Sequence, residues 1–179
     1  MQPEVVKPVK YFIGALFSSE SLLKTAIEMS IDRFGRVDRE SNSFSFNWTT
    51  YYEAEMGKPL YRKLFSFEKL MTPDFLTAAK LFTNEIEQRL AVEGKRQVNL
   101  DVGYLDYDKV VLASAKSGIH KILLSQGIYA DLALHYEKGK YIPYPWAFLD
   151  FQSAEYHPFF LKVREIYKTQ IKILNDKQG

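Results

Sequence analysis

A regular succession of strand-like and helix-like segments between residues 10 and 105 restricts the fold more than any other feature of the chain. Strand-like segments are expected at 10–18, 41–49, 60–70 and 97–105. Apolar residues recur at helical spacing over 20–34, and Thr72-Pro73-Asp74 is typical of the start of a second helix that ends near Gly94. The order strand, helix, strand, strand, helix, strand predicts an α+β domain.

This order is typical of a split βαβ, or ferredoxin-like, sandwich, so we expect an antiparallel sheet with both helices on one face. The strand predicted at 41–49 alternates aromatic and small polar residues. Because side chains alternate across a strand, Phe44, Phe46 and Trp48 are expected to point into the core, and Ser43, Ser45 and Asn47 away from it.

The rest of the chain extends this sheet and closes it with a helix. Strands are predicted at 109–115 and 119–124, then a hairpin formed by 128–135 and 141–144, and a helix over 154–174. We expect a single domain over residues 1–179, with 1–9 as a surface arm and 10–179 as the globular part. A chain of this length buries roughly 70% of its unfolded surface.

Charge and cysteine content exclude several classes of protein. The 24 basic and 22 acidic residues give a net charge of +2, which provides no field for binding nucleic acid or anionic membranes. No cysteine is present, which rules out disulfides and thiolate chemistry and fits a reducing compartment, so a cytoplasmic location is expected. No apolar run approaches the roughly 20 residues needed to cross a bilayer.

Polar residues gather in the stretch from Arg96 to Asp131. Asn99 and Asp101 are two residues apart and share one face of a predicted strand, while Lys116 and His120 flank a Ser-Gly turn. We expect the four to meet at one end of the sheet, with Asp101, His120 and Lys116 as candidate catalytic residues. Asn99, Lys116 and Asp131 are the candidate ligand-binding residues. Lys116 supplies a positive charge for an anion, and His120 would act as a general acid or base.

The sequence also contains a candidate metal site. Glu53 and Glu55 are two residues apart and, together with Asp101, would supply three carboxylates of the kind that bind Mg²⁺ or Mn²⁺. The alternatives are that the two glutamates are solvated, that Asp101 satisfies a turn, and that His120 is a structural hydrogen bonder.

Three stretches carry a resemblance that extends over almost the whole chain: YYEAEMG at 51–57, VNLDVGYL at 98–105 and LASAKSGIHKILLSQGIYADLAL at 112–134. They resemble an uncharacterised prokaryotic family, domain of unknown function 4416. Val102, Lys121 and Asp131 depart from the family pattern, in which Pro, Arg and Glu are usual at these positions. Lys121 keeps the charge of the Arg but not its bidentate geometry. The family has no established activity, so the resemblance implies no mechanism.

Known phosphate-binding and nucleophile motifs are missing from the sequence. The glycines do not form the G-x-x-x-x-G-K-[ST] loop that cradles phosphates, and no Gly-x-Ser-x-Gly elbow is present. Ser114-Ala115-Lys116 resembles the short guanine-contact element of GTPases, but no Asn-Lys-x-Asp accompanies it. The sequence therefore favours a pocket for a small anionic, phosphate-bearing ligand, with metal-assisted hydrolysis as the first reaction class to test. The alternative is a non-catalytic interaction or scaffold protein whose polar residues stabilise turns.

Overall fold

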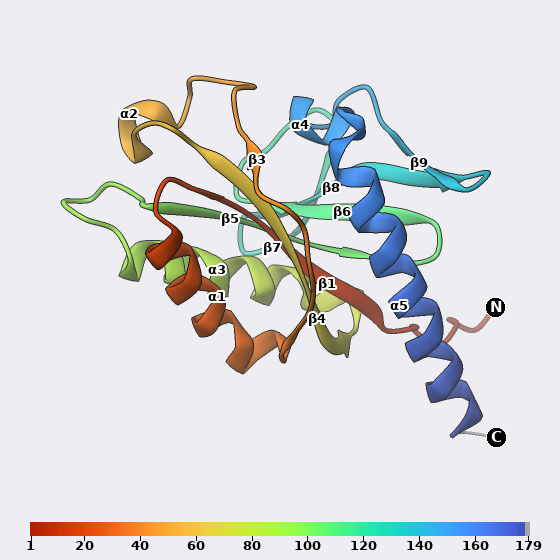
Figure 1. The fold of residues 1–179 in the computed structure, drawn as a ribbon. Helices are drawn as coiled ribbons and strands as arrows, with labels where there is room; N and C mark the ends of the chain where they lie inside the picture. The colour runs from red at the N-terminus through yellow and green to blue at the C-terminus, as the bar shows by residue number, and fades with distance from the viewer. Residues whose placement is uncertain (178–179) are drawn as a thin grey trace.

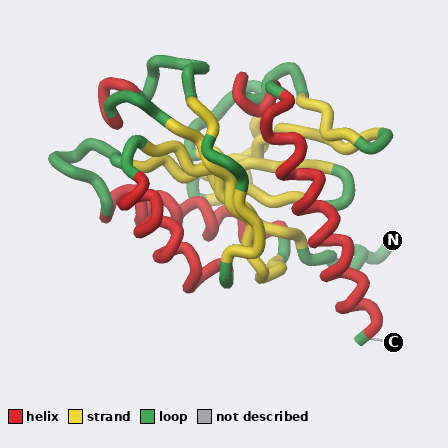
Figure 2. Tube along the Cα trace, viewed as in Figure 1, coloured by secondary structure: helices red, strands yellow, loops and turns green. Residues whose placement is uncertain are grey.

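A computed structural model describes residues 1–177 (Figures 1 and 2). The strands are β1 (Val9–Phe17), β2 (Val37–Glu40), β3 (Phe44–Ser45), β4 (Tyr61–Met71), β5 (Val98–Leu105), β6 (Lys109–Ser114), β7 (Lys121–Ser125), β8 (Ile128–Glu137) and β9 (Lys140–Pro143). The helices are α1 (Glu20–Phe34), α2 (Glu53–Met56), α3 (Leu76–Arg89), α4 (Leu149–Gln152) and α5 (His157–Asp176), with 3-10 turns η1 (Pro73–Phe75) and η2 (Ala154–Tyr156).

All strands belong to one open antiparallel sheet of order β2-β4-β1-β5-β6-β8-β7, with β3 paired to β4 and β9 to β8. Every residue of the central strand β1 is buried, because its neighbours β4 and β5 cover both edges and helices cover both faces. The expected α+β class and antiparallel sheet are confirmed.

The two faces of the sheet carry separate hydrophobic cores. Tyr11 and Ile13 of β1 point into a core shared with α1 and α3, while Phe12 points into a core shared with α5. Figure 1 shows α1 and α3 together on one side of the sheet and α5 across the other. The prediction that the first two helices share one face is correct, and the closing helix covers the opposite face.

Local signals explain where the helices begin and end. The Ser19 hydroxyl accepts a hydrogen bond from the Leu22 amide at 3.5 Å and caps α1, and Gly35 ends this helix with φ +82°. Pro73 begins the short turn η1, which leads directly into α3, but the Thr72 side chain makes no capping hydrogen bond. The predicted start of the second helix is thus correct in position, although its hydroxyl cap does not form.

The predicted strand at 41–49 is wrong in extent. The chain forms β2 earlier and then only the two-residue β3, so the alternation holds for Phe46, which is 6% exposed, and fails for Trp48, which is 40% exposed. Beyond Ser45 the backbone leaves the sheet, so alternation across a pleat no longer sets side-chain direction. The segment between β3 and β4 contains the short helix α2, Glu53–Met56.

The C-terminal half follows the predicted order with shifted boundaries. The apolar stripe of the predicted closing helix, Phe160, Val163, Tyr167, Ile171 and Leu174, is buried in α5 except at Leu174, which is 37% exposed. The expected arm is shorter than predicted, because Val9 already belongs to β1. Within residues 1–177, none of the helices combines the length and apolar character required to cross a membrane.

Strands β5 and β6 pair along only part of their length, and this split creates the candidate site. Pairing is confined to Gly103–Leu105 opposite Val110–Leu112. A Cβ at Gly103 would lie 2.4 Å from the Val111 carbonyl oxygen, so a glycine is needed where the strands meet. Upstream, side chains of α3 replace the missing strand: Glu87 Oε1 accepts from the Leu100 amide at 2.6 Å, and Lys80 Nζ donates to the Leu100 carbonyl at 3.0 Å.

Candidate functional site

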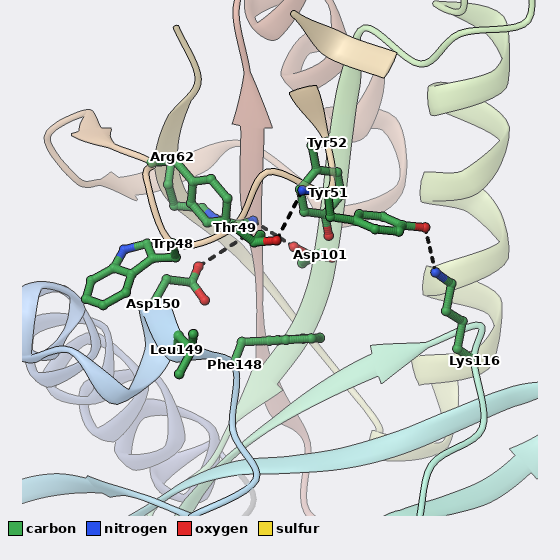
Figure 3. A pocket seen from close by; sticks show the side chains of 11 residues that line it. Trp48, Thr49, Tyr51, Tyr52, Arg62, Asp101, Lys116, Phe148, Leu149 and Asp150 are labelled. Atoms are coloured by element: carbon green, nitrogen blue, oxygen red, sulfur yellow. Dashed lines mark hydrogen bonds and ion pairs between the residues drawn. The ribbon is translucent and has the colours of Figure 1, made fainter. Parts of the chain in front are cut away.

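A cleft of two adjoining chambers opens where β5 and β6 separate. The aromatic chamber has a volume of about 390 Å³ and is lined by Phe46, Trp48, Thr49, Tyr51, Tyr52, Arg62, Asp101, Lys116, Phe148, Leu149 and Asp150 (Figure 3). The polar chamber has a volume of about 310 Å³ and is lined by Tyr51, Tyr52, Lys80, Asn84, Glu87, Arg96, Asn99, Asp101, Leu112, Ala113, Ser114, Ala115, Lys116, Lys121 and Phe148. The residues common to both chambers mark the junction between them.

A buried arginine on β4 organises the aromatic chamber. Arg62 Nη1 donates to the Gly14 carbonyl at 2.8 Å and to Asp101 Oδ2 at 2.7 Å, and its Nη2 lies 3.2 Å from Asp150 Oδ2. Arg62 and Asp150 are each 2% exposed. Figure 3 shows both carboxylates directed at this guanidinium. One cation therefore compensates two carboxylates in a site almost closed to water, which favours a proton on one of them.

The two aspartates differ in their ease of ionisation. Burial disfavours a charged Asp101, but the charges of Arg62 and Lys80, together with the hydrogen bond from Arg62, outweigh it and lower the pKa of Asp101 below its usual value. Burial raises the pKa of Asp150, and the nearby charge of Asp101 raises it further against the opposing effect of Arg62. The Tyr156 hydroxyl also donates to Asp150 Oδ2 at 3.2 Å. The pair thus offers an ionised acceptor beside a carboxyl that is easier to protonate.

A second arginine organises the polar chamber. Arg96 forms a bidentate pair with Glu55, with Nε to Oε1 and Nη2 to Oε2 both at 2.7 Å. Its Nη1 donates to Asn99 Oδ1 at 2.8 Å and lies 3.5 Å from Glu87 Oε2. The Asn99 amide nitrogen and Arg62 Nε are both buried and have no hydrogen-bond partner among residues 1–177. Buried donors without a partner are rare in folded proteins, and these two belong to residues that line the cleft.

Two lysines lie at the rim of the cleft. Lys116 Nζ donates to the Tyr51 hydroxyl at 2.8 Å and lies 4.7 Å from the centre of the Tyr51 ring, and this hydrogen bond lowers the pKa of Tyr51. Lys116 pairs with no carboxylate among the described residues, whereas Lys121 Nζ lies 3.7 Å from Asp131 Oδ2 and donates to Ser114 Oγ at 2.8 Å. Lys116 is therefore the rim cation with the greatest freedom to meet an anion.

The structure brings together three of the residues singled out in the sequence. Asn99, Asp101 and Lys116 line the polar chamber, as the shared face of Asn99 and Asp101 suggested. His120 lines neither chamber and instead stacks on Trp146 with ring centres 4.3 Å apart, so its expected cooperation with Asp101 is not seen. Asp131 is 5% exposed behind Lys121, and burial raises its pKa.

The predicted three-carboxylate metal site does not form. Glu53 Oε2 lies 2.9 Å from Lys58 Nζ, Glu55 pairs with Arg96, and Asp101 with Arg62. Across residues 1–177, no three His, Cys, Asp or Glu side chains are grouped in a way that could hold a metal ion. Each carboxylate already faces its own basic partner, which removes the excess negative charge that a divalent cation needs.

Arg62 and Asp150 were not identified from the sequence. Each is a charged residue in a mainly apolar run, LYRKLFSF around Arg62, which also contains Lys63, and WAFLDF around Asp150. A charged side chain in such a run is buried only when it is paired, so each run carried a signal that the partner would come from elsewhere in the chain.

The fold and the cleft define an α+β protein with an open antiparallel sheet, a C-terminal helix and a ligand-sized cavity beside the central strands. Residues 7–167 match the family described as Domain of unknown function (DUF4416), and the chain belongs to that family. This confirms the resemblance seen in the sequence. No curated protein and no solved structure matches the chain.

Proposed function

We propose that the cleft binds a small anionic, phosphate-bearing molecule with a planar apolar body. The body would lie among the rings of the aromatic chamber, and the anion would meet Lys116 at the junction of the chambers. The observation that carries the proposal is this junction, where a cation without a carboxylate partner among residues 1–177 stands beside Tyr51, Tyr52 and Phe148. Sites for small ligands combine apolar walls with a few convergent polar groups in this way.

The inner surface of the cleft supplies the polar contacts that would orient such a ligand. Asp101 and Asp150 present acceptor oxygens in the aromatic chamber, and the unpartnered donor of Asn99 belongs to the polar chamber. Burial makes each of these contacts selective, because a ligand that fails to satisfy a buried donor or acceptor leaves a desolvated group without a partner.

Metal-assisted hydrolysis is not part of this proposal, because the carboxylates expected to bind the metal are paired with separate basic residues. The second candidate function, a non-catalytic interaction protein, is favoured by one observation. Ile119, Ile122 and Leu123 around β7 are 94%, 71% and 58% exposed, which is unusual for large apolar side chains. A ligand cleft and an interaction surface are compatible in one chain.

We also propose that the N-terminal part of the sheet has the ferredoxin-like arrangement. The order β2-β4-β1-β5 and the placement of α1 and α3 on one face support it. A solved structure in which β2 pairs directly with β1 would contradict this assignment.

Calorimetry and thermal unfolding with three probes test the binding proposal. Phenyl phosphate contains both halves of the proposed ligand, whereas inorganic phosphate and phenol each contain one. We expect phenyl phosphate to raise the unfolding temperature more than either half at the same concentration, because a ligand that binds the folded state alone stabilises it more as its affinity increases.

A matched pair of lysine variants locates the effect. Lys116→Met removes the rim charge, and Lys138→Met removes a charge remote from the cleft, whose side chain is 88% exposed at the β8–β9 turn. The proposal requires phenyl phosphate to lose affinity for the Lys116 variant only. Equal responses of the two variants, or no response of the wild type to any probe, would refute it.

A further inference from the structure

The strand β7 exposes a run of large apolar side chains at one edge of the sheet. Ile122, Leu123 and Leu124 are 71%, 58% and 42% exposed, and Ile119 just before them is 94% exposed. Monomeric proteins rarely leave several large aliphatic residues in sequence open to water. The exposure therefore indicates a surface that is covered by another chain.

The edge position of β7 defines what can cover it. β7 is the last strand in the sheet order and pairs on one side with β8, so its other edge presents backbone donors and acceptors that an extended strand satisfies. The free backbone N–H and C=O groups of β7 are spaced to hydrogen-bond with another extended strand and not with a helix. An antiparallel neighbour would extend the sheet in the pattern already present.

The other sheet edges carry the usual protections against such pairing, and β7 does not. β2 at the opposite edge has three charged residues in four, and β9 has Lys140 and Pro143. The one charge of β7, Lys121, is directed to Ser114 and Asp131. A register irregularity occurs against β8, but it lies between Leu123 and Ser125, at the end that enters the turn.

We propose that β7 pairs antiparallel with β7 of a second copy of this chain and forms a closed dimer. A two-fold axis at Leu123 places Ile122 opposite Leu124 of the other copy and Lys121 opposite Ser125, so apolar groups meet and no like charges face each other. The net charge of +2 gives little repulsion between copies. The pairing occupies the free edge of β7 in each of the two copies, so no β7 edge is left for a third subunit.

Neighbouring rings widen the proposed interface beyond the strand itself. His120 stacks on Trp146, and Trp146 stacks on Tyr144 with ring centres 4.8 Å apart. Trp146 and Ile142 are 37% and 36% exposed. Aromatic residues of this kind contribute much of the energy of protein interfaces.

Sedimentation velocity over a range of concentrations tests the proposal without any ligand, so its outcome is independent of the binding function. We expect the wild type to sediment as a dimer of the 20.8 kDa chain at high concentration. The double variant Ile122→Lys with Leu124→Lys is expected to sediment as a monomer at the same concentration. Ile173→Lys on α5, where the residue is 49% exposed, is the matched control and remains a dimer.

Disulfide trapping gives a second measurement that a folding defect cannot imitate. The chain has no cysteine, so Leu123→Cys introduces a single thiol. Opposed residues in antiparallel strands have Cα atoms about 4.5 to 5.5 Å apart, which is within disulfide range. Mild oxidation should crosslink Leu123→Cys into dimers and leave Ile173→Cys uncrosslinked. A wild type that is monomeric at every concentration, species larger than a dimer, or equal crosslinking of both cysteines would overturn the proposal.

Discussion

The two arginines of the cleft perform similar pairing in different surroundings. The Arg62 side chain is 3% exposed and faces Asp150, also 3% exposed, together with Asp101 at 17%. The Arg96 side chain is 28% exposed, and its main partner Glu55 is 29% exposed. Both guanidiniums bind carboxylates at 2.7 Å, so bond length does not distinguish them. The two arginines differ instead in how far water can reach them.

The comparison shows how burial determines what an ion pair contributes to the stability of the fold. Removing one partner of a buried pair leaves a desolvated charge, which costs several kcal/mol, whereas water replaces a lost partner near the surface at little cost. Arg62 should therefore determine the stability of the aromatic chamber, and Arg96 should adjust the shape of the polar chamber. The predictions that follow test this difference in order of decreasing effect.

The largest effect is expected for Arg62→Met. This change leaves Asp101 and Asp150 buried without their cation, and we expect a loss of about 3 to 5 kcal/mol in the free energy of unfolding. Urea unfolding at neutral pH measures it.

The matched control for Arg62→Met neutralises its partners as well. The triple variant Arg62→Met, Asp101→Asn, Asp150→Asn removes the stranded charges, so it should recover a large part of the loss. A single variant that loses less than about 1 kcal/mol would mean that water reaches this site and that the contrast with Arg96 is wrong.

The next effect separates Asp101 from Asp150 by pH. The lowered pKa of Asp101 contributes stability that is present above the unfolded value near pH 3.9 and is lost as pH falls through the folded pKa. The raised pKa of Asp150 acts in the opposite sense, because the folded state retains a proton that the unfolded state has lost. Its contribution is therefore unfavourable, and grows as pH rises from about 3.9 to the folded pKa.

Unfolding free energies of the wild type, Asp101→Asn and Asp150→Asn across this pH range test the assignment. Titrating groups that are not coupled to Asp101 or Asp150 cancel in each difference between wild type and variant. The advantage of the wild type over Asp101→Asn should increase with pH below about pH 4, and its advantage over Asp150→Asn should decrease as pH rises above that value. Two curves with the same slope would show that the aspartates are not in different states.

A smaller effect is expected for Arg96→Gln. The pair with Glu55 is nearly one-third exposed, so solvent screening limits what its loss costs, and the contacts with the buried Asn99 and Glu87 bring the expected total to about 1 to 2 kcal/mol. The loss should shrink further in high salt, unlike that of Arg62→Met. Urea unfolding in low and high salt compares the two variants, and a salt-independent loss as large as that of Arg62→Met would erase the distinction.

Short-range patterns in the sequence explain which parts of the molecule were predicted. The apolar run of β1, the helix start at Pro73 and the shared face of Asn99 and Asp101 depend on neighbours a few residues apart, and the structure has all three. The pairing of Arg62 with Asp150 joins residues far apart in the chain, and no local pattern encodes it. The same holds for Lys116, which donates to the hydroxyl of Tyr51, 65 residues away in the sequence.

The direction of Trp48 was missed for a related reason. Alternation predicts side-chain direction only while a strand keeps its partner, and β3 ends at Ser45. The ring that was expected in the core instead lines the aromatic chamber.

The smallest effect on stability is expected for Lys116→Met, at the junction of the two chambers. Its ammonium group contacts only an exposed tyrosine among residues 1–177, so the free energy of unfolding should change by less than about 0.5 kcal/mol. The Tyr51 hydroxyl would lose the hydrogen bond that lowers its pKa, so its spectroscopic titration should move to higher pH. Chemical denaturation and an ultraviolet titration measure the two quantities. A loss above about 1 kcal/mol would show that Lys116 stabilises the fold, as Arg62 does, and is not a cation left free to bind a ligand.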